Sequence, residues 1–227
     1  MGVENYPAAC ARIALKAMKD KPKRRALDIG CAIGRSTFEL ARGFDEVIGV
    51  DFSARFIQEA QNFKENSVLR YTMPTEGELE NFHEVKLSDF DLEEERNKVS
   101  FWQADACNLK AIYKGFDLIF GGNLIDRLYD PKKFLDSMAS RINDGGMLIL
   151  TSPYTWQEES TPKEKWIGGY KRDGGNITTL DGLKEILGKN FTLIDTKDVP
   201  FVIQETARKH QHTIAQMTLW EKRGKNV

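Results

Sequence analysis

Short apolar runs alternate along the chain with segments whose apolar residues recur at helical spacing. The runs have the length and composition of strands buried on both faces, and they cover 26–29, 46–51, 99–105, 116–120 and 147–151. The helical spacing covers 8–19, 37–41, 54–60, 131–142 and 179–187. Strands that alternate with helices predict an α/β fold with a doubly wound, mostly parallel sheet and right-handed crossovers.

The last third of the chain has a different pattern. Residues 191–202 and 213–220 alternate apolar and polar positions, which predicts two strands that complete a seven-stranded, Rossmann-like sheet with an antiparallel C-terminal strand. The segment 204–212 is expected to join them. Residues 157–177 are polar and contain glycines, which is typical of a long loop or lid.

Charge accumulates between about 64 and 98, where helical and strand periodicity weaken. A run of charges usually marks a solvated face, so we predict a surface insertion with some helix or hairpin. Its function is not readable from the pattern. With no repeats and no linker composition, residues 1–227 are expected to form a single domain.

Charge and cysteine content narrow the function classes. The 34 acidic and 33 basic residues leave a net charge of −1, which gives no electrostatic footprint for nucleic acid or an acidic membrane. Cys10, Cys31 and Cys107 are far apart, and their odd number argues against a disulfide framework or zinc site. There is no apolar leader and no run long enough to span a bilayer, so a soluble, cytoplasmic protein without a metal is expected.

The segment 26–36 reads as a strand, a tight turn and the start of a helix. Gly30 and Gly34 allow the backbone to turn sharply and to approach a ligand, and the helix start presents free N–H groups. Ala32 stands where a dinucleotide fingerprint would place its second glycine, and the Asp28 carboxylate would repel a pyrophosphate. The turn therefore suits a cationic ligand. Taken alone, the same pattern is also typical of a structural turn that binds no ligand.

Polar or glycine residues follow each of the five predicted parallel strands. Parallel strands end at one edge of a sheet, where ligands bind, so these residues should meet there. They lie in 30–35, 51–53, 105–108, 121–127 and 152–156. Asp51 is placed to receive ribose hydroxyls, and the alternative is that Asp51 or Ser53 only caps the following helix.

The pattern Asp28-x-Gly30-x-x-x-Gly34 resembles motif I of the class I S-adenosylmethionine-dependent methyltransferases. That resemblance implies S-adenosylmethionine as cofactor, with Asp105 on the adenine amino group. No general base and no catalytic triad are expected, because orienting the two reactants can supply roughly 7 to 11 kcal/mol of the barrier. The residues expected to bind the cofactor are Asp28, Gly30, Cys31, Gly34, Arg35, Asp51, Phe52, Ser53, Asp105, Ala106, Cys107 and Asn123.

A narrower resemblance covers nearly the whole chain. Its motifs are Asn5–Ala11, Ala26–Arg42, Asp51–Ile57, Asn123–Pro131, Ser152–Trp156 and Val199–Thr213. They resemble the methyltransferase domain of ovothiol biosynthesis, which implies methyl transfer to the π ring nitrogen of 5-thiohistidine to give ovothiol A. In that family the domain usually follows a sulfoxide synthase in one polypeptide, whereas this sequence starts just before Asn5. A stand-alone enzyme fed by a separate synthase and an excised domain both fit.

The acceptor named by this resemblance carries a carboxylate, an ammonium and a flat ring. Arg127 or Arg208 would hold the carboxylate, and Asp126 or Glu205 the ammonium. The ring would lie against Tyr154, Trp156 or Trp166. The full set expected to bind the substrate is Tyr6, Asp126, Arg127, Tyr129, Tyr154, Trp156, Trp166, Glu205, Arg208 and His212.

Three other functions are weighed against this one. The first keeps the fold and cofactor with a different small-molecule acceptor, and the second is a non-catalytic S-adenosylmethionine-binding partner of a synthase. The third, a nicotinamide-dependent oxidoreductase, is disfavoured by Asp28 and by the missing second glycine.

Overall fold

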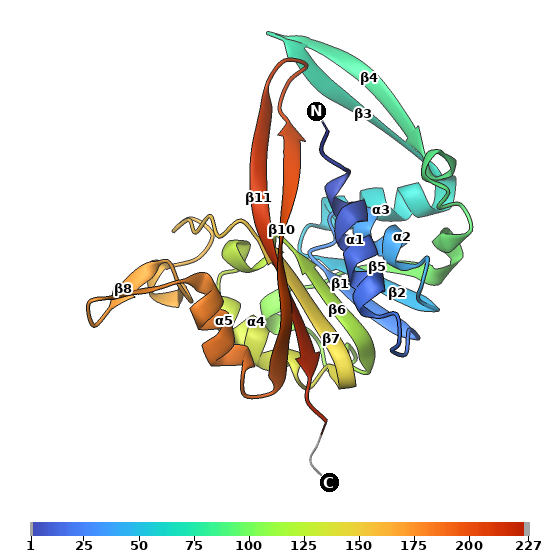
Figure 1. Cartoon of the computed structure of the whole chain (residues 1–227). Coiled ribbons are helices and arrows are strands. Elements are labelled where there is room, and N and C mark those ends of the chain that lie inside the picture. The colour runs from blue at the N-terminus through green and yellow to red at the C-terminus, as the bar shows by residue number, and fades with distance from the viewer. Residues whose placement is uncertain (1, 225–227) are drawn as a thin grey trace.

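A computed structural model describes residues 2–224 of the chain, and its centre is a seven-stranded sheet (Figure 1). The strand order is β10-β11-β7-β6-β1-β2-β5, and only β11 runs antiparallel to the five strands of the parallel core. The strands are β1 (Arg25–Ile29), β2 (Glu46–Asp51), β5 (Val99–Gln103), β6 (Phe116–Gly122), β7 (Ile142–Ser152), β10 (Phe191–Gln204) and β11 (His210–Lys222). The predicted fold class is confirmed, including the antiparallel C-terminal strand.

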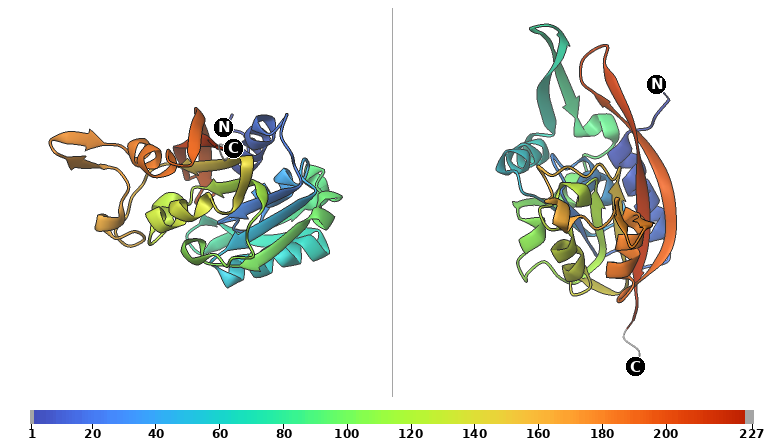
Figure 2. Two further views of the ribbon diagram at one scale, coloured as in Figure 1. Left: turned by 90° about the horizontal axis from the view of Figure 1, so that it is seen from below. Right: turned by 90° about the vertical axis from the view of Figure 1, so that its left-hand side faces the viewer.

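Helices cover both faces of the sheet, as the two further views show (Figure 2). One face carries α1 (Tyr6–Ala17), α2 (Arg35–Leu40) and α3 (Ala54–Asn66), and the other carries α4 (Pro131–Met138) and α5 (Thr179–Leu187). Neighbouring strand residues point to opposite faces, so Ala26 joins the core under α1 while Leu27 joins the core under α4. This is why these strands are continuously apolar instead of alternating.

Several helices begin directly after a residue whose side chain caps the helix N-terminus. The Ser53 hydroxyl accepts a hydrogen bond from the Phe56 N–H, and Asp130 accepts one from Lys133 ahead of Pro131. Thr178 and Asp181 form a capping box at α5. At the first helix the Asn5 side chain accepts from the Ala8 N–H, so α1 begins at Tyr6, two residues earlier than expected.

One boundary error lies between α4 and β7. The periodicity predicted a helix as far as Ile142, but α4 ends at Met138 and β7 already begins at Ile142, which pairs with Phe116. The buried Asp117 carboxylate accepts from the Asn143 amide at 2.7 Å and from the Arg24 N–H at 3.0 Å. These contacts between distant segments draw the polar residues after the helix into the sheet, and no local pattern signals them.

The charged insertion is an antiparallel hairpin of β3 (Val68–Glu76) and β4 (Leu79–Lys86), followed by the 3₁₀ turns η1 (Leu87–Phe90) and η2 (Glu95–Lys98). The segment 157–177, which was expected to be a long loop or lid, contains η5 (Lys163–Lys165) and a small hairpin of β8 (Tyr170–Arg172) and β9 (Gly175–Ile177). Two further 3₁₀ turns follow strands, η3 (Ala106–Asn108) and η4 (Ile125–Arg127). The expected connection 204–212 is shorter in the structure and covers only 205–209, because β10 and β11 stay paired as far as Gln204 and His210.

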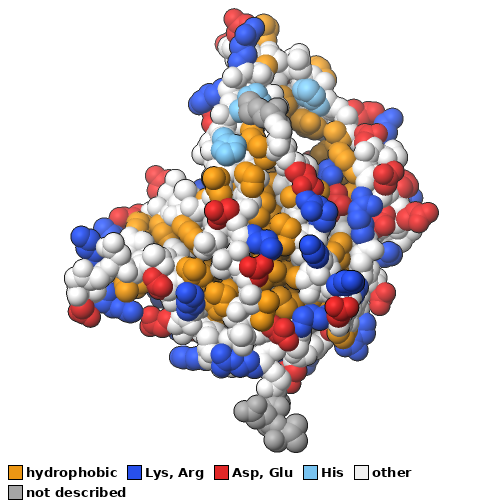
Figure 3. All heavy atoms as spheres, viewed as in Figure 1, with side chains coloured by type: hydrophobic (Ala, Val, Ile, Leu, Met, Phe, Trp, Pro, Cys, Tyr) orange, Lys and Arg blue, Asp and Glu red, His pale blue; other side chains and the backbone are white. Residues whose placement is uncertain are grey.

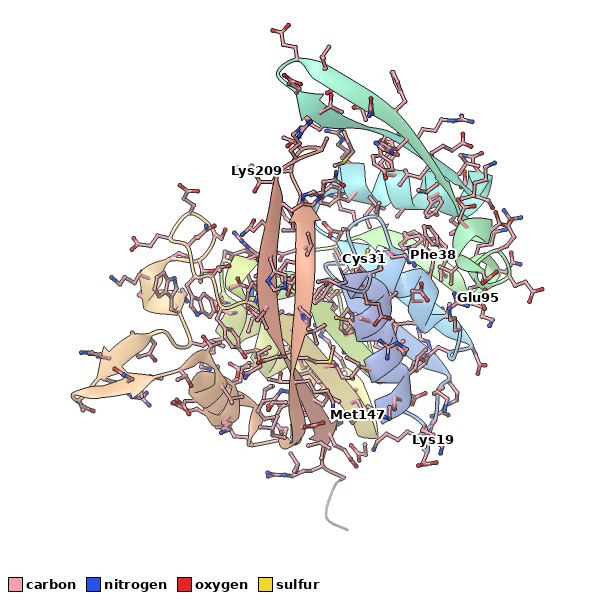
Figure 4. The ribbon with its side chains drawn as sticks, turned by 45° about the horizontal axis from the view of Figure 1, so that its top comes forward. Lys19, Cys31, Phe38, Glu95, Met147 and Lys209 are labelled. Carbon is pink, nitrogen blue, oxygen red and sulfur yellow. The ribbon has the colours of Figure 1, made fainter. Side chains whose placement is uncertain are left out.

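The two long hairpins meet above the carboxyl edge of the parallel strands. The Ala207 N–H, in the turn between β10 and β11, donates a hydrogen bond to the Pro74 carbonyl of β3 at 3.2 Å. Figure 4 shows Lys209 at this tip, beside the far end of the β3–β4 hairpin. The hairpins therefore form an arch over the edge where ligands bind in this fold.

Within residues 2–224, no helix is long and apolar enough to cross a membrane. The same residues contain no cluster of three or more His, Cys, Asp or Glu side chains arranged to hold a metal. All three cysteines are free and buried.

Gly49 in the middle of β2 tests how tightly this core is packed. A Cβ there would lie 2.7 Å from Cδ1 of the buried Phe101 ring and 2.9 Å from the Thr37 hydroxyl. We expect Gly49→Ala to lower the free energy of unfolding by about 1 to 3 kcal/mol, measured by urea unfolding.

Adding Phe101→Leu to Gly49→Ala should restore part of the stability, because it vacates the space the new methyl needs. Gly175→Ala, where the nearest atom is 3.6 Å away, is the matched control with little effect. A Gly49→Ala protein as stable as the parent would contradict this packing.

Candidate functional site

The main cavity lies under the arch, at the carboxyl ends of the parallel strands. Its volume is about 1090 Å³, slightly above the roughly 300 to 1000 Å³ usual for small-molecule sites. Four elements contribute walls: the glycine turn after β1, the start of α1, the first turns of α3, and the β3–β4 hairpin. Segments from the first half of the chain thus form most of it, with Gly122 and Asn123 added from the end of β6.

The glycine turn adopts the backbone conformation that the sequence suggested. Gly30 and Gly34 have φ angles of +75° and +90°, which favour glycine, and Ala32 between them also has a positive φ. A Cβ on Gly34 would lie 2.5 Å from the Phe101 ring. Both Gly30 and Cys31 donate their N–H groups to the Val50 carbonyl, so the turn is fastened to the end of β2. Figure 4 labels Cys31 in this turn.

Asp28 is buried directly below the turn, with 1% of its surface exposed. The hydroxyls of Ser36 and Thr37 donate hydrogen bonds to one carboxylate oxygen, Oδ2, at 2.6 and 2.7 Å. Burial raises the pKa of Asp28 to about 6, the two hydroxyls act in the opposite direction, and the nearby Asp51 raises it further. At neutral pH the carboxylate is ionised and borders the cavity, where it favours a cation.

Asp51 connects two parts of the site. Its Oδ2 accepts from the Ala32 N–H and its Oδ1 from the Ser53 N–H, both at 2.9 Å. Of the two caps considered for the next helix, Ser53 fulfils that role, since its hydroxyl accepts from Phe56. Each Asp51 oxygen keeps a free lone pair, so the carboxylate can accept further hydroxyl groups.

A second, smaller hollow of about 230 Å³ lies beside Asp51. Its walls include Phe52, whose side chain is 73% exposed, and Asp105. The Asp105 carboxylate accepts from the Cys107 N–H and from the Tyr129 hydroxyl, each at 2.8 Å. Tyr129, expected at the substrate, therefore lies on the Asp105 side. Burial raises the pKa of Cys107, which disfavours a reactive thiolate.

These features fit the cofactor named by the sequence resemblance. The glycines allow close approach, the ionised Asp28 suits an ammonium, and the free lone pairs of Asp51 and Asp105 suit hydroxyl and amino groups. The main cavity and the smaller hollow would take the amino-acid and nucleoside parts respectively. Arg35 also lines the cavity, but its guanidinium is paired with Glu39 at 2.8 Å and lies over the Phe90 ring.

A cluster of hydrogen-bonding side chains closes the cavity at the ends of β6 and β7. The Tyr6 hydroxyl lies 2.6 Å from the Thr151 hydroxyl and 2.8 Å from the side-chain oxygen Oδ1 of Asn123. The Asn123 N–H donates to Thr151 Oγ1 at 2.9 Å, and Asn123 has a positive φ of 49°. The sequence indicated Tyr6 and Asn123 but missed Thr151, whose only signal was its place at the end of a strand.

Several residues expected at the substrate are instead engaged in local contacts. Asp126 is fully buried and accepts hydrogen bonds from Ser152 and Thr155, which shapes the loop after β7. The other contacts pair Arg127 with Gln157, Tyr154 with Gln216, Trp156 with Thr179, Trp166 with the Thr161 carbonyl, and Glu205 with Lys209. Trp166 borders a separate cavity between α4 and α5, and Arg208 and His212 lie in the upper β10–β11 hairpin.

The sequence also missed residues that the structure places on the main cavity. Arg55 and Phe56 reach it from α3, and Tyr71 reaches it from β3. Arg55 and Phe56 lie within the motif Asp51–Ile57, but neither was among the residues expected to bind the cofactor or the substrate. Tyr71 lies in the insertion, whose role was not readable from its pattern.

Comparison with known proteins gives one family match and several similar folds. Residues 20–179, well over half of the chain, match a family model described as a methyltransferase domain. An S-adenosylmethionine-dependent methyltransferase from Clostridium acetobutylicum is 15% identical, with a TM-score of 0.61 over 97% of this chain and 93% of its own.

Two other solved structures have similar folds. The N-methyltransferase NodS from Bradyrhizobium japonicum, in complex with S-adenosyl-L-homocysteine, is 16% identical (TM-score 0.57, 93% of this chain and 85% of its own). The [4+2]-cyclase SpnF is 14% identical (TM-score 0.60, 98% and 87%). At these identities the structures share the fold, and one fold serves more than one reaction.

The raised pKa of Asp28 predicts a pH-dependent affinity for the ammonium of S-adenosylhomocysteine. Below about pH 6 the free protein carries a proton on Asp28, which cation binding must displace, so affinity should fall by up to about tenfold per pH unit. We expect calorimetry to show this loss, and Asp28→Asn to reduce it. The comparison with Asp28→Asn separates Asp28 from the three histidines, and identical pH profiles for both proteins would contradict the assignment.

Replacing Asp51 should weaken the binding of S-adenosylhomocysteine, and this loss should not depend on pH. Asp51→Ala removes a charged acceptor for ribose hydroxyls, so calorimetry should show affinity lower by about ten- to a hundredfold, or roughly 1.5 to 3 kcal/mol. Ser53→Ala, which removes only the helix cap, is the control with a smaller effect. Unchanged affinity in Asp51→Ala would mean that Asp51 only fastens the turn.

Proposed function

The chain belongs to the methyltransferase domain family and uses S-adenosylmethionine, and we propose that it methylates the π ring nitrogen of 5-thiohistidine to give ovothiol A. The choice of acceptor is the proposed part, and it rests on the motifs that cover most of the chain. A sulfoxide synthase domain or protein is the proposed source of 5-thiohistidine.

The observation that carries the proposal is the meeting of two motifs from opposite ends of the sequence. Tyr6, from the first motif, packs its ring against Phe201, from the last, with 4.8 Å between the ring centroids. The same Tyr6 hydroxyl contacts Asn123 and Thr151 at the cavity. Residues that resemble one narrow family are therefore in contact beside the cofactor cavity, where an acceptor would lie.

The titratable groups beside Tyr6 favour an acceptor whose attacking atom already has a free lone pair and needs no deprotonation. Burial raises the pKa of Tyr6 far above neutrality and that of Cys10, which lies beside it, to about 12. Both groups keep their protons at neutral pH, so neither is a base there. A neutral ring nitrogen needs none, whereas a hydroxyl acceptor would.

The reaction is a displacement at carbon. The cofactor, when bound, would supply an electrophilic methyl group on its sulfonium. The lone pair of the ring nitrogen would form the new N–C bond as the S–C bond breaks, and the sulfur would keep the electron pair of that bond. The protein orients the two reactants: Asp28 and Asp51 hold the cofactor side, and Tyr6, Asn123 and Thr151 form a fixed polar surface on the acceptor side.

The test incubates the purified protein with isotope-labelled S-adenosylmethionine and a panel of acceptors. We expect methyl transfer to 5-thiohistidine, with much less to histidine and to unrelated thiols, and mass spectrometry should place the methyl on the π nitrogen. Thermal shift with S-adenosylhomocysteine and with NAD is the control, since only a true ligand raises the melting temperature.

Two results would overturn the proposed acceptor. Good turnover of another compound without turnover of 5-thiohistidine would indicate a different small-molecule methyltransferase. Stabilisation by S-adenosylhomocysteine without methyl transfer to any acceptor would indicate a non-catalytic binding partner of a synthase.

A further inference from the structure

The β3–β4 hairpin is a wall of the cofactor cavity, and its two faces have opposite characters. The strand register sets Leu69 opposite Val85 and Tyr71 opposite His83, and directly opposed residues share a face. Leu69 and Val85 pack against the hydrophobic core, so their face turns inward. On the other face Phe82, which is opposite Thr72, points into solvent and is 90% exposed, although Arg70 and Thr72 of β3 also border the cavity.

The inward face carries an aromatic pair that no core packing requires. The rings of Tyr71 and His83 are stacked, with centroids 5.2 Å apart and planes 17° from parallel. Tyr71 lines the cavity, yet its side chain is 40% exposed. Tyr71 is thus a flat ring in the cavity wall, supported from beside it by His83, and another flat ring can lie on it. Figure 3 shows hydrophobic side chains gathered in the hollow beneath this hairpin.

A cation without a partner faces the same cavity. Arg35 and Arg70, which also line it, are paired with Glu39 and Glu84. Arg55 lines it from α3 and is exposed, and among residues 2–224 its side chain makes no hydrogen bond and no ion pair. A free guanidinium in a cavity wall matches a carboxylate, which it can bind through two parallel hydrogen bonds.

The hairpin is held in place at both ends. Its base packs on the core through Leu69 and Val85, and Pro74, near its far end, accepts the hydrogen bond from Ala207 of the opposite hairpin. A wall fixed in this way can select a ligand by shape. The residues expected at the acceptor from the sequence, Asp126 and Arg127, are meanwhile occupied by other contacts.

We propose that the β3–β4 hairpin recognises the acceptor, with Tyr71, backed by His83, stacking on a flat heteroaromatic ring and Arg55 binding the carboxylate of the same molecule. The ligand class is a heteroaromatic amino acid, and this inference rests on the proposed function. It assigns the charged insertion a role in choosing the acceptor, separate from the cofactor contacts of the glycine turn.

The test is calorimetric titration of 5-thiohistidine into protein saturated with S-adenosylhomocysteine. We expect Tyr71→Ala to weaken acceptor binding by about two- to tenfold and Arg55→Ala by about ten- to a hundredfold. Tyr71→Phe keeps the ring and should bind like the parent. Affinity for S-adenosylhomocysteine should stay unchanged in all three, which also shows that they fold.

Matched controls use the same elements. Phe82→Ala removes an aromatic ring from the outward face of the hairpin, and Lys64→Ala removes a positive charge from α3 away from the cavity, so neither should change acceptor binding. A mercaptoimidazole without the amino-acid chain separates the two contacts. Arg55→Ala should bind it as the parent does, while Tyr71→Ala should bind it more weakly.

The outcomes for the two proposals are distinct. If the parent protein binds 5-thiohistidine and both Tyr71→Ala and Arg55→Ala bind it equally well, the hairpin inference is overturned and the proposed function stands. If the parent protein does not bind 5-thiohistidine, the proposed function is overturned. The same variants then test the role of the hairpin with the acceptor that the panel identifies. Unchanged binding of that acceptor by Tyr71→Ala and Arg55→Ala overturns the hairpin inference.

Discussion

The glycine turn between β1 and α2 holds its shape through two carboxylates, and the whole site depends on it. Asp28 accepts from Ser36 and Thr37 below the turn, and Asp51 accepts from Ala32 at its side. These bonds join the start of α2 to β1 and the turn to the end of β2. Because the turn is fastened at both points, the main cavity and the smaller hollow beside Asp105 open on fixed sides of it.

The second constraint is the arch of two hairpins above the strand ends. A parallel sheet alone leaves its carboxyl edge open, and here β3–β4 and β10–β11 meet across it through the bond between Ala207 and Pro74. The N-terminal helix is tied to the same region by the contacts of Tyr6 with Phe201, Asn123 and Thr151. The residues expected at the cofactor thus come from the common core of the fold, and those proposed at the acceptor come from elements added around it.

The cofactor side of the site was largely predictable, because its chemistry lies in short local motifs. Asp28, Gly30 and Gly34 follow one another within a single strand and turn, and Asp51 follows directly after a strand with a clear apolar pattern. The acceptor side was less predictable. Asp126 and Trp156 had suitable chemistry and position in the sequence, but burial and the partners Ser152, Thr155 and Thr179 engage them elsewhere.

The sequence by itself determined the order of strands and helices, the glycine turn and its acids, because each depends on residues close together in the chain. Only the tertiary structure decided which side chains face the cavity. Tyr71 and His83 lie in the charged insertion, whose function the sequence pattern did not indicate, and cross-strand pairing places them on the inward face. Thr151 contacts Tyr6 because the end of β7 lies beside α1. Such contacts join residues far apart in sequence, and periodicity carries no record of them.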